Sequence, residues 1–245
     1  MLILILKILM VLFYLGMLTV NVLANTIPFN QRSTGEISDR YPTLFTPSGF
    51  TFSIWGIIYI FLGIFVVKVL MMTTSSIETQ MVIPLMLVFI VSSIFNMLWL
   101  FLWHYDYIGL STIVMIFLLV TLIYGYINIS TDQVLLKIPF SLYTAWISVA
   151  LIANVSIFLV KNDFKGFNIK PEVYTLFIIL IAGAIGVITI LRMNDMIFGL
   201  VFLWALFGIL LRHMNELNHQ YPIVIYAIIF SMVSLTTTIV YQFVR

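Results

Sequence analysis

Residues 40–68 read RYPTLFTPSGFTFSIWGIIYIFLGIFVVK, and this stretch decides the class of fold. A loop with two prolines leads into an apolar run long enough for a helix of about 20 residues, the length that crosses the hydrocarbon core of a bilayer. Trp55 and Tyr59 lie inside the run. Because lipid offers no hydrogen-bond partner to an indole N–H or a phenol O–H, we expect both rings to face protein or a ligand.

The composition of the whole chain agrees with a membrane protein. Of 245 residues, 63% are hydrophobic and only 8% are charged, too few polar residues to cover the surface of a soluble domain. The net charge of +2 gives no indication of nucleic-acid binding. The absence of cysteine excludes disulfides, thiolate metal sites, iron–sulfur clusters and cysteine nucleophiles.

Apolar runs predict an all-α, polytopic transmembrane bundle of about eight spans. The runs are longer and more continuous than the strands of a transmembrane β-barrel. We expect an integral, multi-pass protein of the plasma membrane, with the lipid bilayer as its surroundings. The predicted spans are residues 1–24, 49–72, 81–103, 108–129, 138–160, 173–191, 196–211 and 222–244, of which the seventh is the shortest.

The first span has a second interpretation. Lys7, the apolar run and the ending at Val22, Leu23 and Ala24 are also typical of a secretory signal peptide. The run is long for such a peptide and the charge lies inside it. We therefore favour a retained helix and keep cleavage as the alternative.

The connections suggest a division of the chain. Residues 1–160 hold five spans, residues 161–172 form a charged linker, and residues 173–245 hold three further spans. The longest connection, 25–48, carries prolines and mixed charges, which fits either an ordered cap over the bundle or a solvated connector. Thr46 and Pro47 predict a helix start, with threonine as the N-cap and proline in the first position.

Three spans carry aromatic and small or amide residues at helical spacing, so each set shares one face of its helix. Converging faces would form a cavity with flat aromatic walls and a few hydrogen-bond donors, suited to a flat, mostly apolar ligand. For Asn96 and Asn154 taken alone, interhelical packing is the better interpretation, and we also assign Trp204 to packing. The three sets are Phe52, Trp55, Tyr59 and Gly63; Ser92, Asn96, Trp99 and Trp103; and Tyr143, Trp146, Ala150 and Asn154.

These motifs resemble the TspO/MBR family of tryptophan-rich sensory proteins over roughly residues 1–160. FTPSGFTFSIWGIIY resembles the proline-rich entry and Trp–x–x–x–Tyr pattern of the family's second helix, and NMLW its Asn–x–x–Trp. PFSLYTAWISVALIAN keeps the Trp, Ala and Asn of the fifth helix but has Phe140 after Pro139. The family has five helices, so the resemblance is to a larger, divergent relative with three added spans.

The resemblance implies a sensory or regulatory protein that binds a porphyrin, a haem-like tetrapyrrole or a sterol. The residues themselves offer no convincing active site, so we expect that the protein is not an enzyme. We expect no metal and no certain cofactor, with a tetrapyrrole as the possible ligand, and a homodimer stays open. The candidate lining residues that the resemblance suggests are Trp55, Tyr59, Asn96, Trp99, Trp146, Ala150 and Asn154.

The positions of the charged residues and histidines bear on other classes of function. Acidic residues lie in loops or near span ends, which speaks against an ion-coupled transporter. A facilitator or channel for a small, weakly polar solute stays open, with residues 25–48 as a gate. His104 beside Asp106, and His213 beside Glu216, are expected to be solvated helix ends rather than haem ligands or parts of a hydrolase site, and we find no convincing active site for an enzyme.

Overall fold

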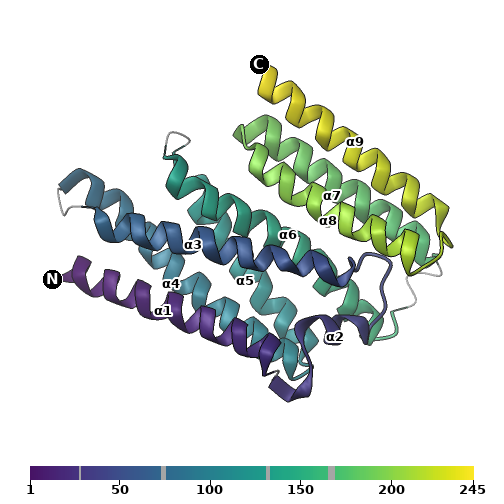
Figure 1. Cartoon of the computed structure of the whole chain (residues 1–245), viewed down its shortest axis with the longest axis horizontal. Coiled ribbons are helices and arrows are strands. Elements are labelled where there is room, and N and C mark those ends of the chain that lie inside the picture. Colours follow the sequence, from purple (N-terminus) through teal and green to yellow (C-terminus); the bar gives the residue numbers. More distant parts are fainter. Residues whose placement is uncertain (28, 73–75, 131–132, 165–168) are drawn as a thin grey trace. The chain divides into compact units, whose positions relative to one another are not determined.

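A computed structural model describes residues 1–27, 29–72, 76–130, 133–164 and 169–245, and only the backbone of 76–81. The described chain is helical, and its long apolar helices match the eight predicted spans. The predicted all-α fold of a polytopic membrane protein is therefore confirmed. The elements are α1 (Leu2–Thr26), η1 (Phe29–Gln31), α2 (Thr34–Asp39), η2 (Gly49–Ser53), α3 (Ile54–Met71), α4 (Ser76–His104), α5 (Ile108–Ile127), α6 (Val134–Lys161), α7 (Pro171–Met193), α8 (Met196–Asn215) and α9 (Pro222–Val244) (Figure 1).

Local sequence explains several helix ends. Pro171 and Pro222 occupy the first turns of α7 and α9, where a missing N–H costs nothing. α7 ends at Asn194, whose φ of 51° is left-handed. Asp195 then caps α8 by accepting a hydrogen bond from the Phe198 N–H at 3.0 Å. The seventh span runs on to Asn215, beyond the predicted end at residue 211.

The chain forms two compact units. The first comprises Met1–Ile37 and Ile54–Ile147, and the second comprises Ser38–Ser53 and Ser148–Arg245. One boundary between the two units lies inside α6, between Ile147 and Ser148. The predicted domains at 1–160, 161–172 and 173–245 stay a prediction, and residues 165–168 of that linker lie outside the described part of the chain.

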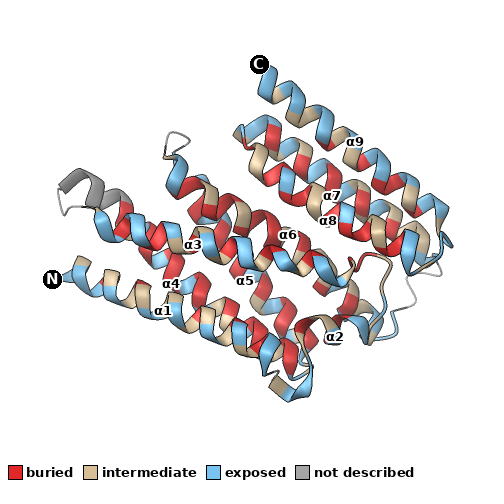
Figure 2. Ribbon diagram, viewed as in Figure 1, coloured by how far each residue is buried: buried red, intermediate tan, exposed pale blue. Residues whose placement is uncertain are grey.

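In the first unit, α1 packs against α3 and α4, and α4 packs against α5. Buried faces turn inward between these helices, and exposed apolar faces turn outward (Figure 2). Close approach requires glycine at Gly63, where a Cβ would lie 2.5 Å from the Tyr14 hydroxyl. That hydroxyl donates to the Tyr59 carbonyl at 2.9 Å and ties α1 to α3.

Lys137 is a basic residue inside the fifth span of the first unit, and it is buried. Its ammonium donates to the Tyr126 carbonyl at 2.6 Å, where α5 ends. It also lies 3.8 Å from the centre of the Tyr126 ring. These partners satisfy the charge and cap the helix.

In the second unit, α7 and α8 both pack against α9, and also against each other. Small residues set these distances, since a Cβ on Gly183 would lie 2.7 Å from the Ser231 hydroxyl. Trp204 packs edge-on against Phe50 at 5.3 Å between ring centres, and its indole donates to the Thr51 carbonyl at 2.9 Å. Its assignment to packing agrees with these contacts.

The described residues of the connector 25–48 are hydrogen-bonded to long helices in each unit, which agrees with the cap interpretation; Pro28 of the connector lies outside the described residues. In the first unit, the Trp103 indole donates to the Thr34 carbonyl at 3.2 Å, and the Asn30 amide donates to the His104 carbonyl at 3.1 Å. In the second unit, the Ser48 N–H donates to the Gly208 carbonyl at 3.1 Å.

Two local predictions are wrong. The predicted helix start at Thr46 and Pro47 is wrong because η2 begins at Gly49 and α3 at Ile54. The Thr46 N–H is already bonded to the Thr43 hydroxyl at 3.1 Å. The expectation of solvated histidines is also wrong, since His104 and His213 are buried. Each ring donates to a backbone carbonyl, of Leu100 at 2.8 Å and of Leu44 at 2.9 Å respectively.

Candidate functional site

An aromatic cluster lies around Trp55, near the start of α3 in the first unit. The indole stacks on Tyr59 with ring centres 5.5 Å apart and on Trp99 of α4 at 6.0 Å. From α6, Tyr143 and Trp146 meet it edge-on, each at 6.1 Å. These stacked and T-shaped arrangements are the favourable ones for aromatic pairs. We call these five residues the Trp55 cluster.

A short hydrogen-bond chain orients the amide of Asn96 beside this cluster. The Asn21 amide nitrogen donates to the Met17 carbonyl at 2.9 Å, and a carbonyl can only accept. The same nitrogen also donates to the Asn96 Oδ1 at 2.9 Å. The oxygen of Asn96 is therefore engaged with α1, and its NH₂ group must lie on the other side.

Several polar atoms at the cluster are buried without a hydrogen-bond partner within the described part of the chain. They are the Asn96 Nδ2, the Trp99 Nε1 and the hydroxyls of Tyr59 and Tyr143. The Asn96 amide lies near both hydroxyls, but no bond of ordinary geometry joins them. An unsatisfied buried polar group costs about 1–3 kcal/mol. Such a concentration of donors needs an explanation, and a ligand with acceptor groups would provide one.

Comparison with known proteins identifies the family. The model of the family described as TSPO-like protein matches residues 7–241. The chain belongs to this family. The match runs through the last three helices as well as the first five, and it makes the chain a multi-pass membrane protein of the TspO type. No curated protein and no solved structure matched the chain.

The TSPO-like chain brings together five of the seven candidate residues. Trp55, Tyr59, Trp99 and Trp146 share ring contacts, and Asn96 lies beside them. Ala150 and Asn154 follow Trp146 along α6 but belong to the second unit. There Ala150 is half-buried and Asn154 is buried. A ligand-binding role for all seven stays a prediction.

Two residues at the site were missing from the candidates. Asn21 fixes the orientation of Asn96, and Tyr143 supplies both a ring and a hydroxyl. Tyr143 stood on the predicted face of its helix and could have been included. Asn21 had a weaker signal as an amide in an apolar span, and its partner lies 75 positions away.

The site carries no obvious metal-ligating group. Among the described residues, there is no group of three or more His, Asp or Glu side chains that could hold a metal ion. The cluster instead offers rings for stacking and N–H or O–H groups for donation. Chemically, it is suited to holding a flat molecule that accepts hydrogen bonds.

Proposed function

We propose that this TSPO-like protein binds a planar, mostly apolar ligand at the Trp55 cluster, in a sensory or regulatory role at the plasma membrane. The ligand is a porphyrin, a haem-like tetrapyrrole or a sterol. The observation that supports this most is the meeting of stacked and edge-on rings from α3, α4 and α6 with buried donors that have no hydrogen-bond partner in the described part of the chain.

The type of donor favours one ligand class within this proposal. The Asn96 NH₂ and the Trp99 indole N–H can only donate. A tetrapyrrole combines a flat aromatic face with carboxylates that accept hydrogen bonds, whereas a sterol brings a single hydroxyl. We therefore place a carboxylate-bearing tetrapyrrole first, with its ring against Trp55 and its carboxylates toward Asn96 and Trp99.

A porphyrin titration with a matched pair of tryptophan variants tests the proposal. Trp55→Leu removes the central ring, and affinity should fall about tenfold or more, since stacking of this kind is worth about 1–3 kcal/mol. Trp204→Leu removes an indole of the second unit that packs on Phe50, and affinity should change less than about twofold. Equal affinity of the wild type and a folded Trp55→Leu variant would contradict the proposal.

A flux measurement distinguishes binding from transport. The alternative function, a facilitator for a small, weakly polar solute, requires sustained movement of solute across a vesicle membrane. The binding function predicts stoichiometric uptake without sustained flux. Flux into liposomes that scales with protein content and is unaffected by Trp55→Leu would favour the facilitator.

A further inference from the structure

Two basic side chains share one tyrosine ring at an edge of the second unit. The Arg40 guanidinium lies 5.7 Å from the centre of the Tyr41 ring, and the Lys161 ammonium lies 5.6 Å from it. Arg40 is exposed, whereas Tyr41 and Lys161 are half-buried. All three belong to the second unit, and attraction to the ring orients both charges. We call these three residues the Tyr41 site.

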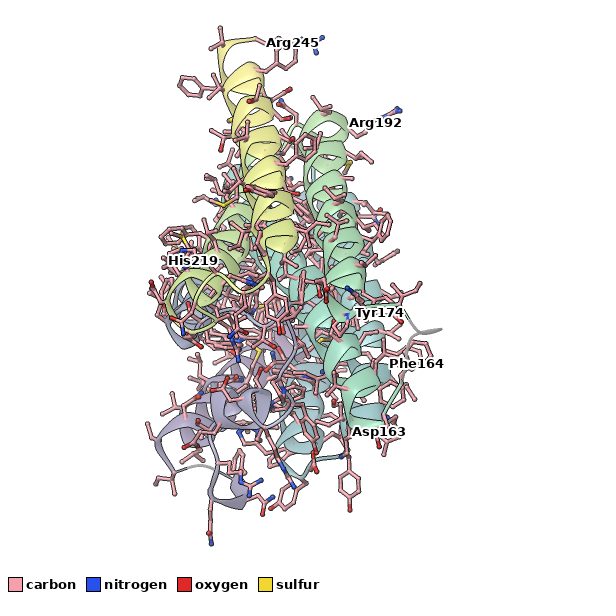
Figure 3. All side chains as sticks on the ribbon, turned by 90° about the vertical axis from the view of Figure 1, so that its right-hand side faces the viewer. Asp163, Phe164, Tyr174, Arg192, His219 and Arg245 are labelled. Carbon is pink, nitrogen blue, oxygen red and sulfur yellow. The ribbon has the colours of Figure 1, made fainter. Side chains whose placement is uncertain are left out.

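The Tyr41 site lies at the level of the lipid headgroups. α6 has 28 residues, so at 1.5 Å per residue it is about 42 Å long, more than the hydrocarbon core of about 30 Å. Lys161 is its last residue and therefore lies at or beyond the edge of the hydrocarbon. Figure 3 shows Asp163, two residues further on, toward the opposite end of the second unit from Arg192 and Arg245.

The charge of Lys161 is not needed to cap its own helix. The Asn162 amide donates to the Phe158 carbonyl at 2.7 Å, and the Phe164 N–H donates to the Leu159 carbonyl at 3.0 Å. These bonds satisfy carbonyls that the end of a helix leaves open. Helix capping therefore does not explain why Lys161 lies over Tyr41.

Residues 39–41 bring a second positive charge to this edge. The Asp39 carboxylate lies 3.5 Å from the Arg212 guanidinium of α8, and the Tyr41 ring lies beside Lys161 of α6. The segment thus joins the ends of two helices of the second unit and places Arg40 at the same ring as Lys161. Two cations at one ring repel each other beside a low-dielectric bilayer, and a bound anion would offset that repulsion.

We propose that the Tyr41 site binds the phosphate of an anionic phospholipid. Guanidinium and ammonium groups both donate to phosphate oxygens, and phosphates are the anions that a bilayer offers at this level. A zwitterionic lipid would add a further cation, so the anionic class is favoured. Phe158, three residues before Lys161 and so on the same side of α6, is exposed and offers apolar surface to the acyl chains.

A lipid titration of the full-length protein in detergent, followed by native mass spectrometry, tests the site. Phosphatidylglycerol should bind the wild type at least about tenfold more tightly than phosphatidylcholine with the same acyl chains, since each basic residue near the surface contributes about fivefold. The double variant Arg40→Gln and Lys161→Gln should lose most of this preference. Equal affinity of the wild type for the two lipids would overturn the proposal.

A matched double variant separates the site from the overall charge. Arg192→Gln with Arg245→Gln removes two exposed arginines at the other end of the second unit, and the preference should change less than about twofold. Equal losses in the two double variants would assign the preference to net charge and contradict the Tyr41 site. Inorganic phosphate should not displace the lipid, because it has no acyl chains, and displacement would show that the site takes free phosphate instead.

Discussion

Asn96 connects the core of the first unit with the candidate site. Its Oδ1 accepts a bond from Asn21 of α1, and its NH₂ has no partner among the described residues. The packing interpretation and the binding interpretation thus apply to different atoms of one side chain. The bond between α1 and α4 holds the amide so that its donors lie on the side of the tyrosine hydroxyls.

Replacing Asn21 should cost stability. Asn21→Leu removes the bond to Asn96, and the free energy of unfolding should fall by about 0.6–2 kcal/mol, the range for interhelical hydrogen bonds in membranes. Thermal unfolding in detergent measures the change. Asn25→Ala is the control, because among the described residues the Asn25 amide bonds within its own helix, to the Asn21 carbonyl of α1. A loss of stability with Asn25→Ala as large as that with Asn21→Leu would contradict the role given to the Asn21–Asn96 bond.

The indole of Trp99 allows its ring and its donor to be tested separately. Trp99→Phe keeps an aromatic ring but removes the N–H, which has no partner among the residues that the structure describes. The affinity for a carboxylate-bearing porphyrin should fall about five- to tenfold. Trp103→Phe removes an N–H that is bonded to the Thr34 carbonyl. It should lower stability and leave affinity nearly unchanged. If Trp99→Phe and Trp103→Phe bind the porphyrin with equal affinity, the Trp99 N–H does not contact the ligand.

At the scale of elements, the short helix α2 has a capping box whose carboxylate should make the stability of the helix depend on pH. The Ser33 N–H donates to the Glu36 carboxylate at 2.7 Å, and the Glu36 N–H donates to the Ser33 hydroxyl at 3.3 Å. The hydrogen bond from the Ser33 backbone lowers the pKa of Glu36. Because the pKa of Glu36 is lower in the folded state, its carboxylate stabilises α2 to the full extent at a pH above the unfolded pKa of about 4.3. This stabilisation is lost as the pH falls through the pKa that Glu36 has in the folded state.

Hydrogen exchange should detect that loss. Protection factors of the amides in α2 should decrease as pH falls below about 4.3, and Glu36→Gln should make them largely independent of pH over the same range. If wild type and Glu36→Gln respond to acid in the same way, Glu36 does not stabilise α2 through its charge.

Gly208 determines how closely the second half of the connector approaches α8. A Cβ at this position would overlap the Thr51 hydroxyl and lie 2.8 Å from its methyl group. Gly208→Ala should therefore displace residues 48–53 and increase their amide exchange. Gly56→Ala is the matched control, because a Cβ on Gly56 meets no atom within 4 Å. Unchanged exchange of residues 48–53 in Gly208→Ala would show that the contact is easily accommodated.

At the scale of the whole molecule, the spans were predictable because length and hydropathy determine them. The eight runs reappear as helices with ends shifted by a few residues. The face carrying Trp55 was predictable from helical periodicity. The Asn21–Asn96 bond was not, because it joins positions 75 residues apart. The predicted helix start at Thr46 is wrong because the N–H groups of that turn bond elsewhere. The Thr46 N–H donates to the Thr43 hydroxyl, and the Ser48 N–H donates to the carbonyl of Gly208, which is distant in sequence.

The buried histidines show the same limit of sequence reasoning. A histidine beside a carboxylate near a span end is usually solvated. His104 and His213 are instead covered by the connector, whose Phe29 packs on His104 at 5.8 Å in the first unit. In the second unit, its Leu44 carbonyl accepts from His213. Only the tertiary path of the connector, which the local sequence does not encode, determines their burial.

The most direct measurement is a structure of the full-length protein in lipid with a carboxylate-bearing porphyrin bound. The proposed function predicts the macrocycle against Trp55, with a carboxylate oxygen within about 3 Å of the Trp99 Nε1 or the Asn96 Nδ2. A porphyrin bound elsewhere, with the Trp55 cluster packed as it is here and its donors still without partners, would contradict it.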